Sequence, residues 1–201
     1  MRRLIRSIPA LVAILCSGLM VSLAMADDDH HDSHRQVQAR LSGFNEVHFS
    51  GGPPATLRGA VSTEARGTFT AKIDEQDNLI TYELRYQDLE GEVTQGHIHF
   101  GQQHTVGGIV VWLCQTEGTP VPDEVADVTP VCPEEGSVTG TITPEQVLEA
   151  TNQGLDAGEF DELVGAIRAG TAYVNVHSSL FPPGEIRGQI DDHEDDDHED
   201  D

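Results

Sequence analysis

Alternation of apolar and polar residues with a period of two constrains this chain more than any other feature. In the clearest stretch, residues 80–86, apolar and aromatic side chains alternate with Thr81, Glu83 and Arg85. Because successive side chains of a β-strand point to opposite faces, this pattern predicts a strand with one buried face. Further strands are predicted over residues 37–41, 67–73, 96–101, 108–114, 137–142, 172–177 and 184–190.

The order of these strands predicts an all-β fold. Short polar turns at 74–78 and 178–183 predict two hairpins, and the almost entirely apolar run 108–114 predicts a central strand buried on both faces. Thr143, Pro144 and Gln146 form a helix-start signal, which predicts a short helix to about residue 150; apolar spacing predicts a second helix over 159–169. We therefore expect an immunoglobulin-like or Greek-key β-sandwich or barrel, with one or two short helices in a crossover.

The two ends of the chain differ in composition from the middle. Residues 1–26 combine arginines, an apolar run and an Ala24-Met25-Ala26 cleavage pattern, which predicts a secretory signal peptide and export to the periplasm or the exterior, with no membrane association after its removal. Residues 27–34 and 191–201 are rich in acids and histidines and lack apolar side chains, so we expect disordered tails around one domain over 35–190.

Charge and cysteine content narrow the classes of partner. The formal net charge is −24, which disfavours nucleic acid and favours cationic partners such as metal ions. The predicted mature chain keeps two cysteines, Cys114 and Cys132, and a cysteine pair in an exported chain predicts a disulfide. The chain has no G-x-S-x-G, P-loop or H-E-x-x-H motif, so a non-catalytic role is favoured.

Four segments of the chain form a recognisable set: Leu41-Ser42-Gly43 through Glu46-Val47, His97-Ile98-His99, residues 141–147, and residues 173–177 leading into 183–189. In order and rough spacing they resemble the CHRD domain, the repeat found in chordin and in many bacterial exported proteins. The resemblance implies an immunoglobulin-like or barrel-like β fold outside the cytoplasm and, by analogy with a growth-factor antagonist, a binding or structural module with a protein partner. The chain departs from the family pattern at His48 and His104, each of which adds a histidine.

Histidines on two predicted strands suggest a metal site. His97 and His99 share one strand face, and joining them to His177 resembles the copper-ligand arrangement of copper/zinc superoxide dismutases. His104 is the candidate fourth ligand. Asn175, Glu185 and Arg187 are expected to support the ligands from neighbouring strands.

Three interpretations of this histidine set remain open. It could bind copper or zinc; it could be a polar cluster that only stabilises a structural or protein-interaction module; or it could serve dismutase-like redox chemistry. The acidic tails allow two further interpretations, as weak metal binders or as solubilising segments.

Overall fold

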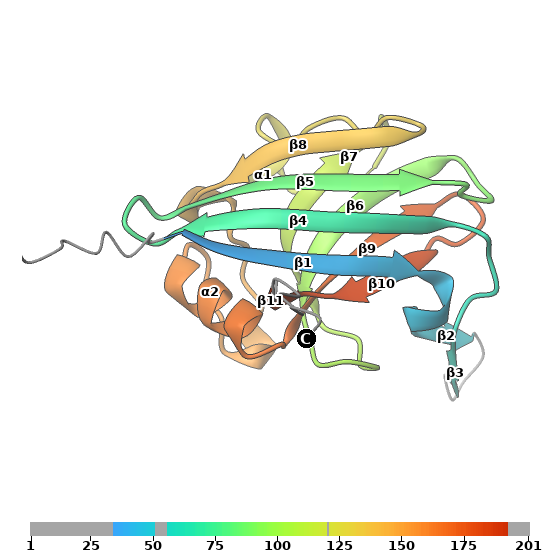
Figure 1. Ribbon diagram of the computed structural model, residues 1–201, viewed down its shortest axis with the longest axis horizontal. Helices are drawn as coiled ribbons and strands as arrows, with labels where there is room; N and C mark the ends of the chain where they lie inside the picture. The colour runs from blue at the N-terminus through green and yellow to red at the C-terminus, as the bar shows by residue number, and fades with distance from the viewer. Residues whose placement is uncertain (1–33, 51–55, 120, 193–201) are drawn as a thin grey trace, which may run out of the picture. The chain divides into compact units, whose positions relative to one another are not determined.

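The structure is a computed structural model that describes residues 34–50, 56–119 and 121–192. The predicted signal peptide and most of the two predicted tails lie outside the described residues. Nine antiparallel strands form one nearly closed, barrel-like sheet, which confirms the all-β prediction (Figure 1).

The sheet has the strand order β7-β6-β9-β10-β1-β4-β5-β8, and β11 pairs with β1. In Figure 1 the strands β8, β5, β4 and β1 form the near layer, with β7, β6, β9 and β10 behind it. A separate two-stranded sheet pairs β2 with β3. The strands are β1 (His34–Ser42), β2 (His48–Ser50), β3 (Thr56–Gly59), β4 (Arg66–Asp74), β5 (Leu79–Gln87), β6 (Val93–Phe100), β7 (Gly108–Gln115), β8 (Gly136–Ile142), β9 (Ala172–Ser178), β10 (Ile186–Gln189) and β11 (Asp191–Asp192).

Both predicted hairpins are present. Strands β4 and β5 pair with Phe69 opposite Leu84, and their alternating inward side chains belong to the core. Strands β9 and β10 pair with Arg187 opposite Asn175. Strand β9 also pairs with β6, so the two predicted histidine strands are direct neighbours in the sheet.

One predicted helix is wrong and the other is confirmed. The start signal at Thr143 does form a capping box, but only the 3₁₀ turn η2 (Pro144–Gln146) follows it, with a second turn, η3 (Thr151–Gln153), further along. The chain leaves the helical path because the Leu148 N–H donates to the Val110 carbonyl at the edge of β7. The confirmed helix α2 (Phe160–Arg168) packs its apolar face on the core, and a four-residue helix, α1 (Asp123–Ala126), was not predicted.

Strand β7 differs from its prediction as a central strand. It is buried, but it stands at one end of the strand order. Backbone groups on its outer edge find hydrogen-bond partners outside the sheet. The Leu148 N–H donates to the Val110 carbonyl, and the Cys132 N–H donates to the Gln115 carbonyl. An apolar run indicates that both faces of a strand are buried, but it does not indicate a central position in the sheet. Segments that are not strands can cover a strand as well as neighbouring strands can.

The described strands reach one residue before and two residues after the range 35–190. His34 begins β1, and Asp191 and Asp192 form β11, which pairs with β1 at Gln38 and Val37. The Arg35 guanidinium forms an ion pair with Asp192. Among the described residues no helix is long and apolar enough to cross a membrane.

Cys114 and Cys132 form the predicted disulfide; they are 18 positions apart in sequence, and their Cα atoms are 4.9 Å apart. Replacing both by alanine should lower the free energy of unfolding by about 3 kcal/mol, because the reduced loop regains conformational entropy in the unfolded state. Urea denaturation of the oxidised protein and the double variant measures this difference. A loss below about 1 kcal/mol would contradict the expectation.

Candidate metal centre

The histidine cluster lies on the outer face of the sheet, where β6 pairs with β9. His97 stands opposite Asn175 and His99 opposite Tyr173, and Gln95 stands opposite His177. The intervening side chains of Ile98, Val174 and Val176 belong to the core on the other face. Strand periodicity therefore separates an apolar inner face from a polar outer face at this position.

Burial of this outer face comes from loops that fold over it. The exposed fractions of His97, His99 and His177 are 0%, 7% and 6%, as low as those of core residues. One covering loop, residues 101–107, follows β6, and another, residues 179–185, follows β9. The loops bring backbone carbonyl groups into contact with the imidazole rings.

These carbonyl groups determine the tautomers of two histidines. His99 Nδ1 lies 3.0 Å from the Gly107 oxygen, and His177 Nδ1 lies 2.8 Å from the Pro182 oxygen. A carbonyl oxygen only accepts hydrogen bonds, so both Nδ1 atoms carry the proton and donate. The Nε2 atoms of neutral His99 and His177 then hold lone pairs, as in imidazoles that bind metals through Nε2.

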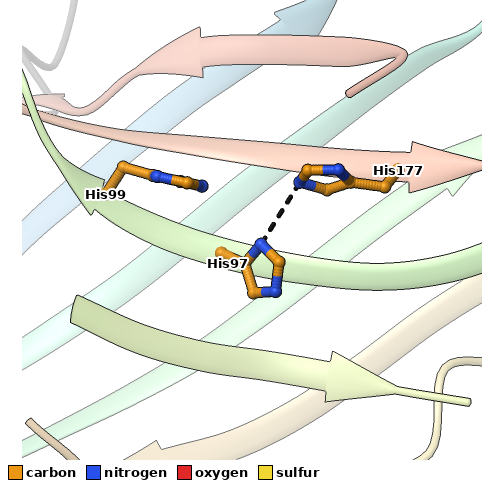
Figure 2. Close-up of side chains that lie close together, drawn as sticks. All are labelled: His97, His99 and His177. Atoms are coloured by element: carbon orange, nitrogen blue, oxygen red, sulfur yellow. Dashed lines mark hydrogen bonds between the residues drawn. The ribbon is translucent and has the colours of Figure 1, made fainter. Parts of the chain in front are cut away.

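Ring nitrogens of the three histidines converge. One ligand atom of each of His97, His99 and His177 lies within 4.8 Å of the others, a spacing that could hold a metal ion. His97 Nδ1 is 3.2 Å from His177 Nε2, and Figure 2 shows these two rings meeting across the strands with His99 beside them.

Asn175 adds an oxygen to the same space. Its Oδ1 lies 3.1 Å from His99 Nε2 and 3.0 Å from His177 Nε2. Its Nδ2 lies on the opposite side: a Cβ on Gly184 would meet Asn175 Nδ2 at 2.9 Å and a carboxylate oxygen of Glu46 at 2.5 Å. The amide nitrogen therefore faces the carboxylate, and the amide oxygen faces the histidines.

His97 differs from the other two histidines because no carbonyl sets its tautomer. Within the described part of the chain, its Nε2 is buried and has no hydrogen-bond partner. Its ring packs edge-on against Trp112, with centroids 4.2 Å apart. Whichever nitrogen holds the proton, the neutral ring leaves either an unpaired buried Nε2 or a lone pair facing another lone pair, and both cost free energy.

Burial keeps the three imidazoles neutral. Desolvation lowers the pKa of His99 and of His177 to about 4, and it lowers the pKa of His97 well below its usual value of 6.5. Burial also raises the pKa of the Glu46 carboxyl, against the opposing effects of the Val47 N–H, Arg187, His48 and Asn175. At neutral pH the cluster presents three uncharged nitrogen donors, the form that binds metals.

Arg187 and Glu185, two of the predicted supporting residues, have different roles in the structure. Arg187 donates to the carbonyl oxygens of Thr105 at 2.7 Å and Gln102 at 3.1 Å, so it holds the loop that carries Gly107. Glu185 instead accepts hydrogen bonds from the Thr63 hydroxyl and the Glu90 N–H, and it faces away from the histidines.

His104 is not brought into the cluster. It is exposed on the loop 101–107, with a φ of 63°. Among the described residues, the group that could hold a metal ion consists of His97, His99 and His177 and does not include His104. The prediction of a fourth ligand placed His104 on the loop after the histidine strand, and that loop is held by Arg187 of β10 through the Gln102 and Thr105 carbonyls.

Several contacting groups were missed from the sequence. Glu46 was noted only as part of a motif, Trp112 was included only in the apolar run 108–114, and no side chain signals the carbonyls of Gly107 and Pro182. One signal was available in the doublet Gly107-Gly108. A Cβ on Gly107 would lie 1.8 Å from the Phe100 oxygen, so only glycine permits this close approach of two backbones.

Comparison with known families gives one finding. The family model described as the CHRD domain matches residues 37–190, which include every residue of the cluster. A search of curated proteins and a search of solved structures gave no match.

The metal-free protein should lose stability as the pH falls from about 6.5 toward about 4. In this range the unfolded chain binds protons on His99 and His177, which stay neutral when folded, so protonation favours unfolding. Between pH 7 and pH 5 the loss should be on the order of 2 kcal/mol for each of these histidines. Urea denaturation at a series of pH values measures it.

A matched pair of variants separates this effect from the titration of carboxylates. His177→Gln should reduce the loss between pH 7 and pH 5 by the share of one histidine, because His99 is still present, whereas His104→Gln, which changes an exposed histidine, should leave the loss as it is. Identical pH profiles for the two variants would show that the buried ring does not govern acid stability.

Proposed function

The chain belongs to the CHRD domain family, and we propose that this member binds a transition metal ion, copper or zinc, through His97, His99 and His177. The observation that carries the proposal is the convergence of lone pairs. Carbonyl oxygens hold the protons of His99 and His177 on Nδ1, so both Nε2 lone pairs face His97 and the Asn175 oxygen. A bound cation would stabilise this arrangement of acceptors.

The donor set favours copper or zinc over harder cations. Three imidazole nitrogens suit copper and zinc, whereas calcium and magnesium prefer six or more oxygen ligands. Three protein ligands also leave a position for a further donor, for which Asn175 Oδ1 is the nearest oxygen of the cluster. The hydrogen bonds to Gly107 and Pro182 would orient the rings, as outer contacts do for metal-bound histidines.

Export is part of the same proposal. The Cys114–Cys132 disulfide supports it, because structural disulfides persist mainly in oxidising compartments outside the cytoplasm. In such a compartment the protein would act as a metal-binding module. Metal binding by the acidic, histidine-bearing ends of the chain remains a prediction, as does redox turnover at the cluster.

A second candidate function is a structural or interaction module without metal. The hydrogen bonds from His99 to Gly107 and from His177 to Pro182 favour it, because they attach two loops to the sheet whether or not a cation is bound. The two functions differ in whether metal is retained by the cluster.

Metal retention should depend on the cluster histidines. After exposure to copper or zinc and extensive dialysis, the protein should retain about one more metal ion per chain than the His97→Ala/His99→Ala variant, because the variant lacks two of the three nitrogen donors. Mass spectrometry of metal content measures this difference. The matched control, His104→Ala, removes an exposed histidine and should retain as much metal as the unchanged protein.

Fluorescence locates the ion independently of its amount. Trp112 is the chain's one tryptophan, and its ring lies 4.2 Å from that of His97. Copper(II) at the cluster should quench its emission with saturation near one equivalent, in the unchanged protein and in His104→Ala alike. Equal metal content and equal quenching in all three proteins would assign metal to other parts of the chain and leave the histidines with a structural role.

A further inference from the structure

A polar pocket lies beside Arg187, separate from the histidine cluster. Its volume is about 280 Å³. Arg40 and His104 line it, together with amide side chains, and Asp191 is the one acid among its lining residues. Two arginines in one pocket are notable in a chain that carries 11 basic residues against 35 acidic ones.

Arg187 brings a buried charge to this pocket. Its exposed fraction is 2%, and its guanidinium donates to two backbone carbonyls and lies over the Tyr173 ring, 3.4 Å from the centroid. Within the described part of the chain, no carboxylate lies within ion-pair distance of it, although the Glu46 carboxyl interacts with it at longer range. A buried cation without an ion-pair partner is costly, so an anion that reached it would be bound favourably.

The geometry and composition of the pocket point to a carboxylate. A guanidinium has five N–H donors, and two carbonyl acceptors leave others free on Arg187. Arg40 adds a second, exposed guanidinium at the same pocket. Arginines bind carboxylates through paired charge-assisted hydrogen bonds, and the amides of Gln38, Asn45 and Gln103 offer further donors.

We propose that this pocket, between Arg40 and Arg187, binds a carboxylate group. The carboxylate could come from two sources with the same chemistry. One is a free small carboxylate. The other is the chain itself, because Asp191 lines the pocket and residues 193–201, which follow β11 directly, contain seven aspartates and glutamates.

Calorimetric titration with succinate tests the pocket. The full chain, freed of metal on a chelating resin, is titrated at low ionic strength, where charge attraction is least screened. Succinate should bind saturably, and Arg40→Gln should weaken the binding at least fivefold. The matched control is Arg85→Gln, which neutralises an exposed arginine of β5 outside the pocket and should leave the affinity unchanged.

Arg187→Lys provides a second variant. It keeps the charge but loses the planar pair of donors, so it should also weaken succinate binding, and circular dichroism reports whether it folds. If Arg187→Lys does not fold, the Arg40→Gln result decides the proposal. Arg40 is exposed, so its replacement should leave the fold intact. The proposal would be overturned by equal binding to the Arg40→Gln and Arg85→Gln variants, or by the absence of saturable binding both to the unchanged protein and to a variant without the acids of residues 194–201.

A full-length variant with the seven acids of residues 194–201 changed to the matching amides distinguishes the two sources. If the chain's own carboxylates occupy the pocket, this variant should bind succinate more tightly than the unchanged protein. Equal affinities would assign the pocket to a free carboxylate.

Discussion

Two backbone carbonyl oxygens, those of Gly107 and Pro182, determine what the histidine cluster can do. Each accepts the Nδ1 proton of one histidine and so directs the Nε2 lone pair of that ring toward its neighbours. The side chains alone would allow either tautomer. The cluster becomes a set of converging donors because both covering loops present oxygen, not N–H, at these positions.

The loops in turn depend on buried polar residues of the sheet. Arg187 holds residues 102 and 105 and thereby the loop that ends at Gly107. Strand β9 lies between β6 and β10, and Tyr173 stands opposite His99 on β6 and opposite Gln189 on β10. Arg187, two residues before Gln189 on β10, places its guanidinium over the Tyr173 ring. The Tyr173 ring stacks on His99 at 4.7 Å and under the guanidinium at 3.4 Å. This packing links the histidine cluster to the pocket beside Arg187.

The fold could be predicted wherever local pattern and burial agree. Alternation identified strands such as β5 because one face of each is buried in the core. The helix predicted from Thr143 failed although its capping box is real, because the hydrogen bond from Leu148 to the edge of β7 competes with helix propagation. A start signal of this kind specifies one turn, and tertiary contacts decide how far the helix continues.

The sequence by itself determined which side chains share a face. His97 and His99 lie on one side of β6, and Asn175 and His177 on one side of β9, because strand geometry repeats every two residues. Only the tertiary structure decided that these two faces join, that loop carbonyls orient the rings, and that His104 and Glu185 turn elsewhere. The physical reason is the distance along the chain over which each feature is decided. The direction of a side chain follows from the local backbone geometry. The pairing of strands some 80 residues apart and the placement of loops follow from burial of the whole core.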